Sequence, residues 1–491
     1  MTPRLLAAAL LLAFGCNPTL PPTAGPDPTP TLAPTATPVP TATEGSNPPS
    51  SSSPVGLAWQ DCEDEFQCSS LEVPLDYDEP MGPTTTLALI RRQADSRSER
   101  VGSIVVNPGG PGGSGIAFVQ GSWHVFGPDL TDRFDIVGFD PRGIGQSDAV
   151  HCLDTRPALT AGAPDTAAEE AAYEELAQEV VAACEANSAD LLPHVGTANV
   201  ARDLDRIRDA LGEGKLNYIG FSYGTFIGAL YADMFPTNIR AMVLDGPLDP
   251  SVDFATFIHD QSAASQEELD EFLDSCAPDP SCPFSAGDQT RADFEELMGQ
   301  FEEGPIDGVT APEAWAAIYG ELVADDDVSL ANILELAQDG DVALIRQAGV
   351  SARDARQLDG YEAVNCLDYP MPQDPEGMAA AAAEVEELAP DMGPTNVYTY
   401  FNCAYWPVGA TRTPGPVVGA GAPPILVIAS TGDPATPYIW GQALADQLKS
   451  AILITRHGDG HTSMRFSFCV REIVTDYVLN LAAPITDTNC T

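Results

Sequence analysis

The sequence predicts an α/β protein in which helices cover a mainly parallel, doubly wound sheet, with a long helical insertion. Short apolar runs occur at residues 87–90, 103–106, 135–139, 217–221, 241–244, 425–429 and 452–455. They have strand length and are continuous rather than alternating, as expected for strands buried on both faces. Helical patterns at 200–211, 225–234 and 438–448 lie between several of them. Strands that alternate with helices are typical of a doubly wound sheet.

The alternation of strands and helices stops between residues 251 and 424. Acidic helical patterns replace it at 266–275, 292–303, 312–324 and 376–388. We expect this insertion to form a helical cap over the carboxyl ends of the strands, where sites form. The core then has a first part, 55–250, and a second part, 425–491.

The N-terminal residues 1–16 have the pattern of an export signal. Arg4 is followed by an apolar stretch, 5–14, that is too short to span a bilayer. Ala13-Phe14-Gly15-Cys16 resembles the lipobox of bacterial lipoproteins, which implies lipidation of Cys16. An ordinary signal peptide cut nearby is the alternative. We therefore expect a protein outside the cytoplasm, either anchored to the outer face of the cell membrane through Cys16 or secreted.

Residues 17–54 are rich in Pro, Thr and Ser and contain few large apolar side chains. Such a segment cannot bury enough surface to fold, so we expect a disordered, semi-extended linker.

The charge balance is strongly acidic, with 72 Asp and Glu against 22 Lys and Arg, a formal net charge of −50. This surface repels phosphate backbones and anionic headgroups, so nucleic acid is excluded as the main partner. It favours the approach of a cationic substrate group, although a role in solubility alone is the alternative.

The chain has 11 cysteines, and ten remain once Cys16 is set aside. An even set in an exported chain indicates disulfides, although spacing does not fix their connectivity. Pairing neighbours in chain order gives 62–68, 152–184, 276–282, 366–403 and 469–490. The alternative is metal binding, but the sequence has no CxxC pair or tight His/Cys cluster, so no metal site is predicted.

A G-x-S-x-G motif, Gly220-Phe221-Ser222-Tyr223-Gly224, follows the strand at 217–221 and precedes a helix. A serine on a tight strand-to-helix turn exposes its hydroxyl between small neighbours. The motif in this context predicts an α/β-hydrolase fold with Ser222 as nucleophile.

Asp433 and His461 each follow a predicted strand, and the order Ser, Asp, His is that of α/β-hydrolases. His461 would take the proton of Ser222, and Asp433 would orient the imidazole. His457 and Asp459 are competitors close in sequence, but the glycine-flanked turn suits His461 better.

A glycine-rich loop at 107–115 directly follows the strand at 103–106. Glycines let backbone donors approach a reacting oxygen, so an oxyanion loop is expected. A phosphate loop is the alternative, but no lysine is present and prolines interrupt a dinucleotide fingerprint. No cofactor is predicted.

Several motifs together resemble known peptidases. Pro108-Gly109-Gly110-Pro111-Gly112 is similar to the His-Gly-Gly-Pro-Gly loop of prolyl iminopeptidases, with Pro108 in place of His, and residues 140–147 resemble their Asp-x-Arg-Gly-x-Gly-x-Ser element. The elbow, the stretch 244–250 and the Cys-rich cap look closer to secreted bacterial tripeptidyl aminopeptidases.

This resemblance implies an exopeptidase that removes short peptides, tripeptides among them, from free N-termini. It implies backbone N–H groups of Gly110 and Tyr223 in the oxyanion hole, and an acidic site for the substrate ammonium. Glu362 and Asp368 in the cap are the candidates for that site. A solvated acidic surface is the alternative for both.

Three function classes remain open from the sequence. A peptidase acting on a free N-terminus and an esterase would share the same triad, because both pass through an acyl-enzyme. A hydrolase fold used for binding alone is disfavoured by the complete triad. The oligomeric state is not indicated.

Overall fold

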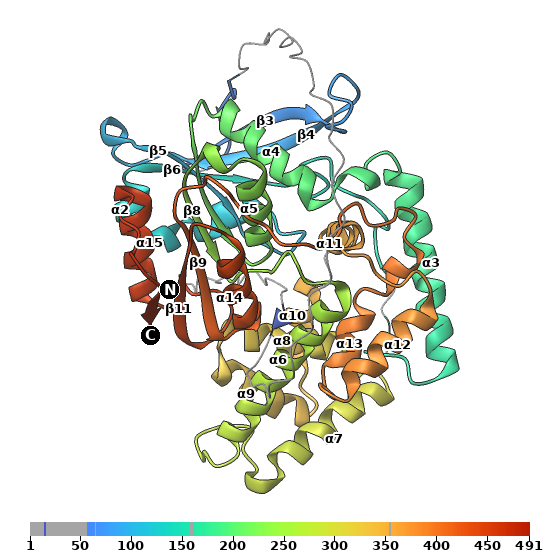
Figure 1. Ribbon diagram of the computed structural model, residues 1–491. Helices are drawn as coiled ribbons and strands as arrows, with labels where there is room; N and C mark the ends of the chain where they lie inside the picture. The colour runs from blue at the N-terminus through green and yellow to red at the C-terminus, as the bar shows by residue number, and fades with distance from the viewer. Residues whose placement is uncertain (1–13, 16–55, 64, 157–158, 160–161, 353–354) are drawn as a thin grey trace, which may run out of the picture.

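A computed structural model describes residues 14–15, 56–63, 65–156, 159, 162–352 and 355–491 (Figure 1). Cys16, the linker 17–54 and most of the predicted export signal lie outside the described residues. Phe14–Gly15 (β1) pairs antiparallel with Pro434–Ala435 (β10). No helix in the described part of the chain is long and apolar enough to cross a membrane.

A ten-stranded sheet forms the centre of the protein, in the order β12-β11-β9-β8-β7-β5-β6-β4-β3-β2. Its strands are β2 (Gln60–Asp61), β3 (Phe66–Pro74), β4 (Thr84–Arg92), β5 (Gly102–Asn107), β6 (Phe134–Phe139), β7 (Leu216–Phe221), β8 (Ile239–Asp245), β9 (Ile425–Gly432), β11 (Ala451–Asp459) and β12 (Thr488–Cys490). The strands from β12 to β6 pair in parallel, and β4, β3 and β2 are antiparallel. The predicted mainly parallel sheet is confirmed.

Helices cover both faces of this sheet, as the continuous burial of β5, β6 and β7 requires. One face packs against α1 (Gly115–Ser122), α2 (Gly127–Thr131) and α15 (Phe468–Asn480). The other packs against α4 (Thr197–Ala210), α5 (Tyr223–Met234) and α14 (Tyr438–Gln447). Figure 1 shows α15 and α2 on one side of the strands and α14 on the other. The doubly wound arrangement is therefore confirmed.

A helical cap occupies the insertion between β8 and β9, below and beside the sheet in Figure 1. Its helices are α6 (Phe254–Cys276), α7 (Thr290–Glu303), α8 (Ala311–Ala324), α9 (Asp327–Gln338), α10 (Ala343–Ala352), α11 (Ala355–Asp368), α12 (Pro375–Glu386), α13 (Gly393–Tyr398) and the 3-10 helix η6 (Phe401–Tyr405). Helices α6 to α9 share a separate apolar core. A further helix, α3 (Ala167–Ser188), lies outside the insertion in sequence but packs on η6.

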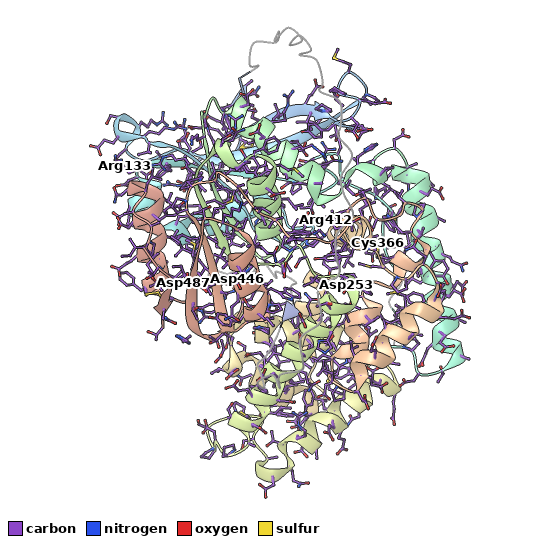
Figure 2. All side chains as sticks on the ribbon, in the orientation of Figure 1. Arg133, Asp253, Cys366, Arg412, Asp446 and Asp487 are labelled. Atoms are coloured by element: carbon purple, nitrogen blue, oxygen red, sulfur yellow. A yellow bond between two sulfur atoms is a disulfide. The ribbon has the colours of Figure 1, made fainter. Side chains whose placement is uncertain are left out.

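The structure forms the five disulfides that pairing in chain order predicts. They are Cys62–Cys68, Cys152–Cys184, Cys276–Cys282, Cys366–Cys403 and Cys469–Cys490. Cys366, labelled in Figure 2, fixes α11 to η6 within the cap.

Candidate active site

Ser222 lies on the tight turn between β7 and α5, with φ +54°. The turn needs small neighbours, because a Cβ on Gly220 would lie 2.3 Å from the Gly224 carbonyl oxygen. Ser222 is fully buried beneath the cap, and its Oγ has no hydrogen-bond partner among the described residues. A buried hydroxyl without a partner costs stability, which is typical of a reactive group.

His461 and Asp433 form a buried pair beside this turn. His461 Nδ1 lies 2.9 Å from Asp433 Oδ1, and both side chains are almost completely buried. Asp433 also accepts the N–H groups of Ala435 and Thr436 at 2.7 and 2.8 Å. The carboxylate accepts, so Nδ1 carries the proton and Nε2 is free to accept another. No described residue bonds to Nε2.

The competing residues lie elsewhere. His457 is exposed, and its Nε2 lies 2.8 Å from Asn489 Oδ1. Asp459 is exposed as well. Of the residues weighed from the sequence, His461 is therefore the one placed against Asp433.

Asp245, the last residue of β8, ties the serine turn to the histidine loop. Its carbonyl oxygen accepts the Ser222 N–H at 2.9 Å. Its carboxylate accepts the N–H groups of Ser463 and Met464 at 2.8 and 2.9 Å. Burial raises the pKa of Asp245 to about 6, against the effect of these bonds. One buried residue therefore sets the distance between the two loops.

The cap also contacts the histidine loop. The Val323 carbonyl, near the end of α8, accepts the His461 N–H at 3.1 Å. Arg456 donates to the carbonyls of Asp459 and Gly460 and so holds the turn that precedes His461. The orientation of the imidazole thus depends on both core and cap.

The glycine-rich loop lies directly against Ser222. A Cβ on Gly109 would lie 2.7 Å from the Ser222 Cβ and 3.0 Å from the Tyr223 nitrogen. Asn107 Oδ1 accepts the Gly109 N–H at 3.0 Å, which fixes the start of the loop. Gly110 and Tyr223 both line the cavity at Ser222.

The motif at residues 140–147, which resembles an element of the prolyl iminopeptidases, contacts the end of this loop. Asp140 accepts from Ser114 Oγ at 2.6 Å, just beyond the glycines. Arg142 is fully buried and forms a bidentate pair with Asp203, both contacts being 2.7 Å. These charges are internally paired, so the motif holds the fold rather than meeting substrate.

A cavity opens at Ser222 between core and cap. Its lining residues are Gly110, Pro111, Ser222, Tyr223, Leu248, Phe257, Gln261, Tyr361, Asn365, Tyr369 and Tyr400. Its volume of about 20 Å³ is enough for one or two water molecules. A substrate residue therefore enters only when lining side chains or the cap move.

The placement of Glu362 and Asp368 does not fit the predicted ammonium site. Arg156 forms a bidentate pair with Glu362 at 2.5 and 2.9 Å. Asp368 accepts the Thr197 N–H at 3.0 Å and is fully buried. Neither carboxylate lines the cavity. Both are engaged by internal donors and lie outside the lining of the cavity, so this structure does not present either one to a substrate ammonium at Ser222.

Cap residues next to these carboxylates line the cavity instead. Tyr361 and Asn365 are four residues apart on α11 and so share one face of the helix, and Tyr369 follows the helix. The spacing of four was a usable signal in the sequence. No pattern in the sequence indicated that Arg156 pairs with Glu362.

Three carboxylates gather near Asp433. The carboxylate oxygens of Glu268, Glu271 and Asp459 lie within 4.8 Å of one another and could share a cation. Burial, followed by the charges of Asp459 and Glu271, raises the pKa of Glu268 to about 9. That the protein needs no metal ion is still only the prediction made from its sequence.

The pKa of Glu268 predicts a pH-dependent stability. The folded state binds the proton of Glu268 more tightly than the unfolded chain does, in which the pKa of this residue has its ordinary value of 4.5. The contribution of Glu268 to the free energy of unfolding is then fully present below about pH 4.5 and is lost as the pH rises toward about 9. We expect Glu268→Gln to raise the Tm above that of the wild type at alkaline pH and to leave it unchanged under acidic conditions. Thermal unfolding across this range measures the effect.

The matched control is Glu335→Gln, which changes an exposed glutamate on α9. This variant should follow the wild-type pH profile throughout. Parallel profiles for Glu268→Gln and the wild type would contradict the prediction.

Hydrolysis through a serine nucleophile is the chemistry that this arrangement supports, and the relatives agree. Serine protease Hip1 of Mycobacterium tuberculosis is 34% identical over 454 residues, covering 86% of this chain and 87% of that protein. Tripeptidyl aminopeptidase of Streptomyces lividans is 33% identical over 476 residues, covering 89% and 87%. Carboxylesterase B of Mycobacterium tuberculosis is 32% identical over 466 residues, covering 86% of each chain. The chain is a serine hydrolase.

The family follows from the same comparison. Residues 102–464 match the alpha/beta hydrolase fold family. The chain belongs to this family.

Proposed function

We propose that this serine hydrolase is an aminopeptidase that releases short peptides, tripeptides among them, from free N-termini. The observation that carries the proposal is the 33% identity to a tripeptidyl aminopeptidase over 89% of the chain. The narrow cavity under the cap supports it, since a chain end reaches Ser222 more readily than the middle of a folded chain.

In the proposed reaction Ser222 Oγ attacks the carbonyl carbon of the scissile peptide bond and gives its proton to His461 Nε2. Backbone N–H groups of Gly110 and Tyr223 stabilise the oxyanion. The C–N bond then breaks, and His461 returns the proton to the leaving amine. Water hydrolyses the acyl-enzyme by the same route, which restores Ser222. Asp433 stabilises the imidazolium formed at each step.

The negative field of the protein supports recognition of an ammonium group. With Glu362 and Asp368 paired internally, attraction of the substrate N-terminus rests on the formal net charge of −50 rather than on those two residues. Added salt should therefore raise KM for a free-amine peptide by screening this attraction.

An esterase is the second candidate. The cavity is walled by Leu248, Phe257 and tyrosines and contains no carboxylate among its described lining residues. An apolar acyl group suits such a wall, and one relative is named a carboxylesterase.

Paired kinetics on one tripeptide amide separate the two candidates. The peptide is assayed with a free N-terminus and then acetylated, beside a simple acyl ester. The aminopeptidase predicts that acetylation reduces kcat/KM on the order of 100-fold, since it removes the positive charge that the negative field of the protein attracts. Turnover of the ester alone would reject the aminopeptidase and leave the serine hydrolase in place.

We also propose that the chain is exported and anchored through Cys16. Five disulfides among the described residues support an oxidising compartment. Expression with Cys16→Ala tests the anchor, which predicts transfer of the protein from the membrane fraction to the medium. Identical fractionation of both forms would contradict lipidation.

A further inference from the structure

Asp368 ends α11 in the cap, yet its main partners belong to the core. Its Oδ1 accepts the N–H of Thr197, the first residue of α4, at 3.0 Å. Its Oδ2 accepts a hydrogen bond from Thr197 Oγ1. Arg412, labelled in Figure 2, lies at the same place and donates to the Asp368 carbonyl at 3.5 Å. The carboxylate is therefore anchored between cap and core.

The Thr197 hydroxyl continues this chain of hydrogen bonds to Tyr223. Thr197 Oγ1 and Tyr223 Oη form a second hydrogen bond, and all three side chains are buried. An ionised carboxylate can only accept, and threonine has a single hydroxyl proton. The threonine proton thus goes to Asp368, and Tyr223 donates to Thr197. Donation in this series of hydrogen bonds therefore runs in one direction, from Tyr223 through Thr197 to the Asp368 carboxylate.

Tyr223 is also the residue that follows the nucleophile. It is the first residue of α5, so its N–H has no partner within the helix and is available to an oxyanion. Its ring packs edge-on against Phe226, with centroids 6.2 Å apart. The phenol and the backbone N–H belong to one residue, so the position of the first constrains the second.

We propose that Asp368 is a positioning residue, which acts through Thr197 to hold the Tyr223 N–H in the oxyanion hole and so couples the cap to catalysis. The proposal rests on the proposed role of that N–H. It gives Asp368 a part in the reaction without contact with substrate. Displacement of the cap would loosen the oxyanion donor, and closure would restore it.

The test breaks the chain of hydrogen bonds at each link, with Tyr223→Phe, Thr197→Val and Asp368→Asn. None of these removes the backbone N–H. We expect each to lower kcat about 10- to 100-fold with little change in KM, because a donor misplaced by a fraction of an ångström loses much of its effect in the transition state. Affinity for a peptide aldehyde, which forms an oxyanion on Ser222, should fall by the same factor.

Two further variants separate this effect from a general loss of stability. Thr197→Ser keeps the hydroxyl and should recover most of the kcat lost in Thr197→Val. Tyr231 is on α5 with Tyr223 but away from the turn, and its hydroxyl donates to Asp205 of α4 at 2.9 Å. Tyr231→Phe removes this hydrogen bond and should keep wild-type kcat. The double variant Tyr223→Phe/Thr197→Val should be no slower than either single variant, because both break one chain.

The outcomes are distinguishable. Folded variants with wild-type kcat and aldehyde affinity would overturn the inference, as would additive losses in the double variant. A wild type that cleaves esters but not free-amine peptides would reject the aminopeptidase alone, and the same variants are then assayed on the ester. Active-site titration of each variant corrects for any misfolded fraction.

Discussion

Ser222→Ala is expected to lower kcat on the order of 10⁶-fold, the loss found when a serine nucleophile that acts with its histidine is removed. The variant should fold normally. Its lost hydroxyl is buried without a partner, so the free energy of unfolding should stay the same or rise by about 1 kcal/mol. Steady-state kinetics and chemical denaturation measure the two effects.

The control is Ser103→Ala, which removes a buried hydroxyl at the start of β5 that does have partners, Arg100 and Glu213. This variant should lose about 1 kcal/mol of stability and keep its kcat. Measurable turnover by Ser222→Ala above about a thousandth of the wild-type rate would remove Ser222 from the mechanism.

Removal of the Cys366–Cys403 disulfide is expected to have the largest effect on stability. The bond closes a sequence separation of 37 residues, for which the loss of chain entropy in the unfolded state is about 4 kcal/mol. It also fixes α11, which carries Tyr361 and Asn365 at the cavity. The double replacement of both cysteines by alanine should therefore lower stability and, less strongly, kcat.

The Cys62–Cys68 disulfide provides the comparison, with a separation of 6 residues beside β2 and β3. Its removal should cost about 2 kcal/mol and leave kcat unchanged. Denaturation under identical conditions ranks the two variants. Equal losses of stability in the two variants would show that the length of the closed loop does not determine the effect.

The sequence predicted the central strands well because their apolar runs are continuous. It missed β3 and α3. In β3 only Phe66, Val73 and Pro74 are buried, and the strand lies in the antiparallel part of the sheet, so no continuous apolar run marks it. In α3 the buried residues Tyr173, Ala177 and Cys184 follow helical spacing, and Thr166 and Glu169 form a capping box, so the sequence did contain a helical signal there.

The site was predictable only where it follows from position along a strand. Ser222, Asp433 and His461 each come directly after a strand of the parallel sheet or close to its end, so the fold places them at one edge. The partners of the cap carboxylates are set by tertiary structure. Arg156 is 206 residues from Glu362, and Thr197 is 171 residues from Asp368. No local pattern contains such a pairing.

The short last strand, β12, has a consequence for self-association. Its three residues pair with β11, and the Cys469–Cys490 disulfide fastens them to α15. Without it, Ile454, Thr455 and Arg456 in the middle of β11 would present unpaired backbone donors and acceptors, which is a template for aggregation. Loss of the final residues of the chain would therefore threaten solubility at high protein concentration while leaving the catalytic groups in place.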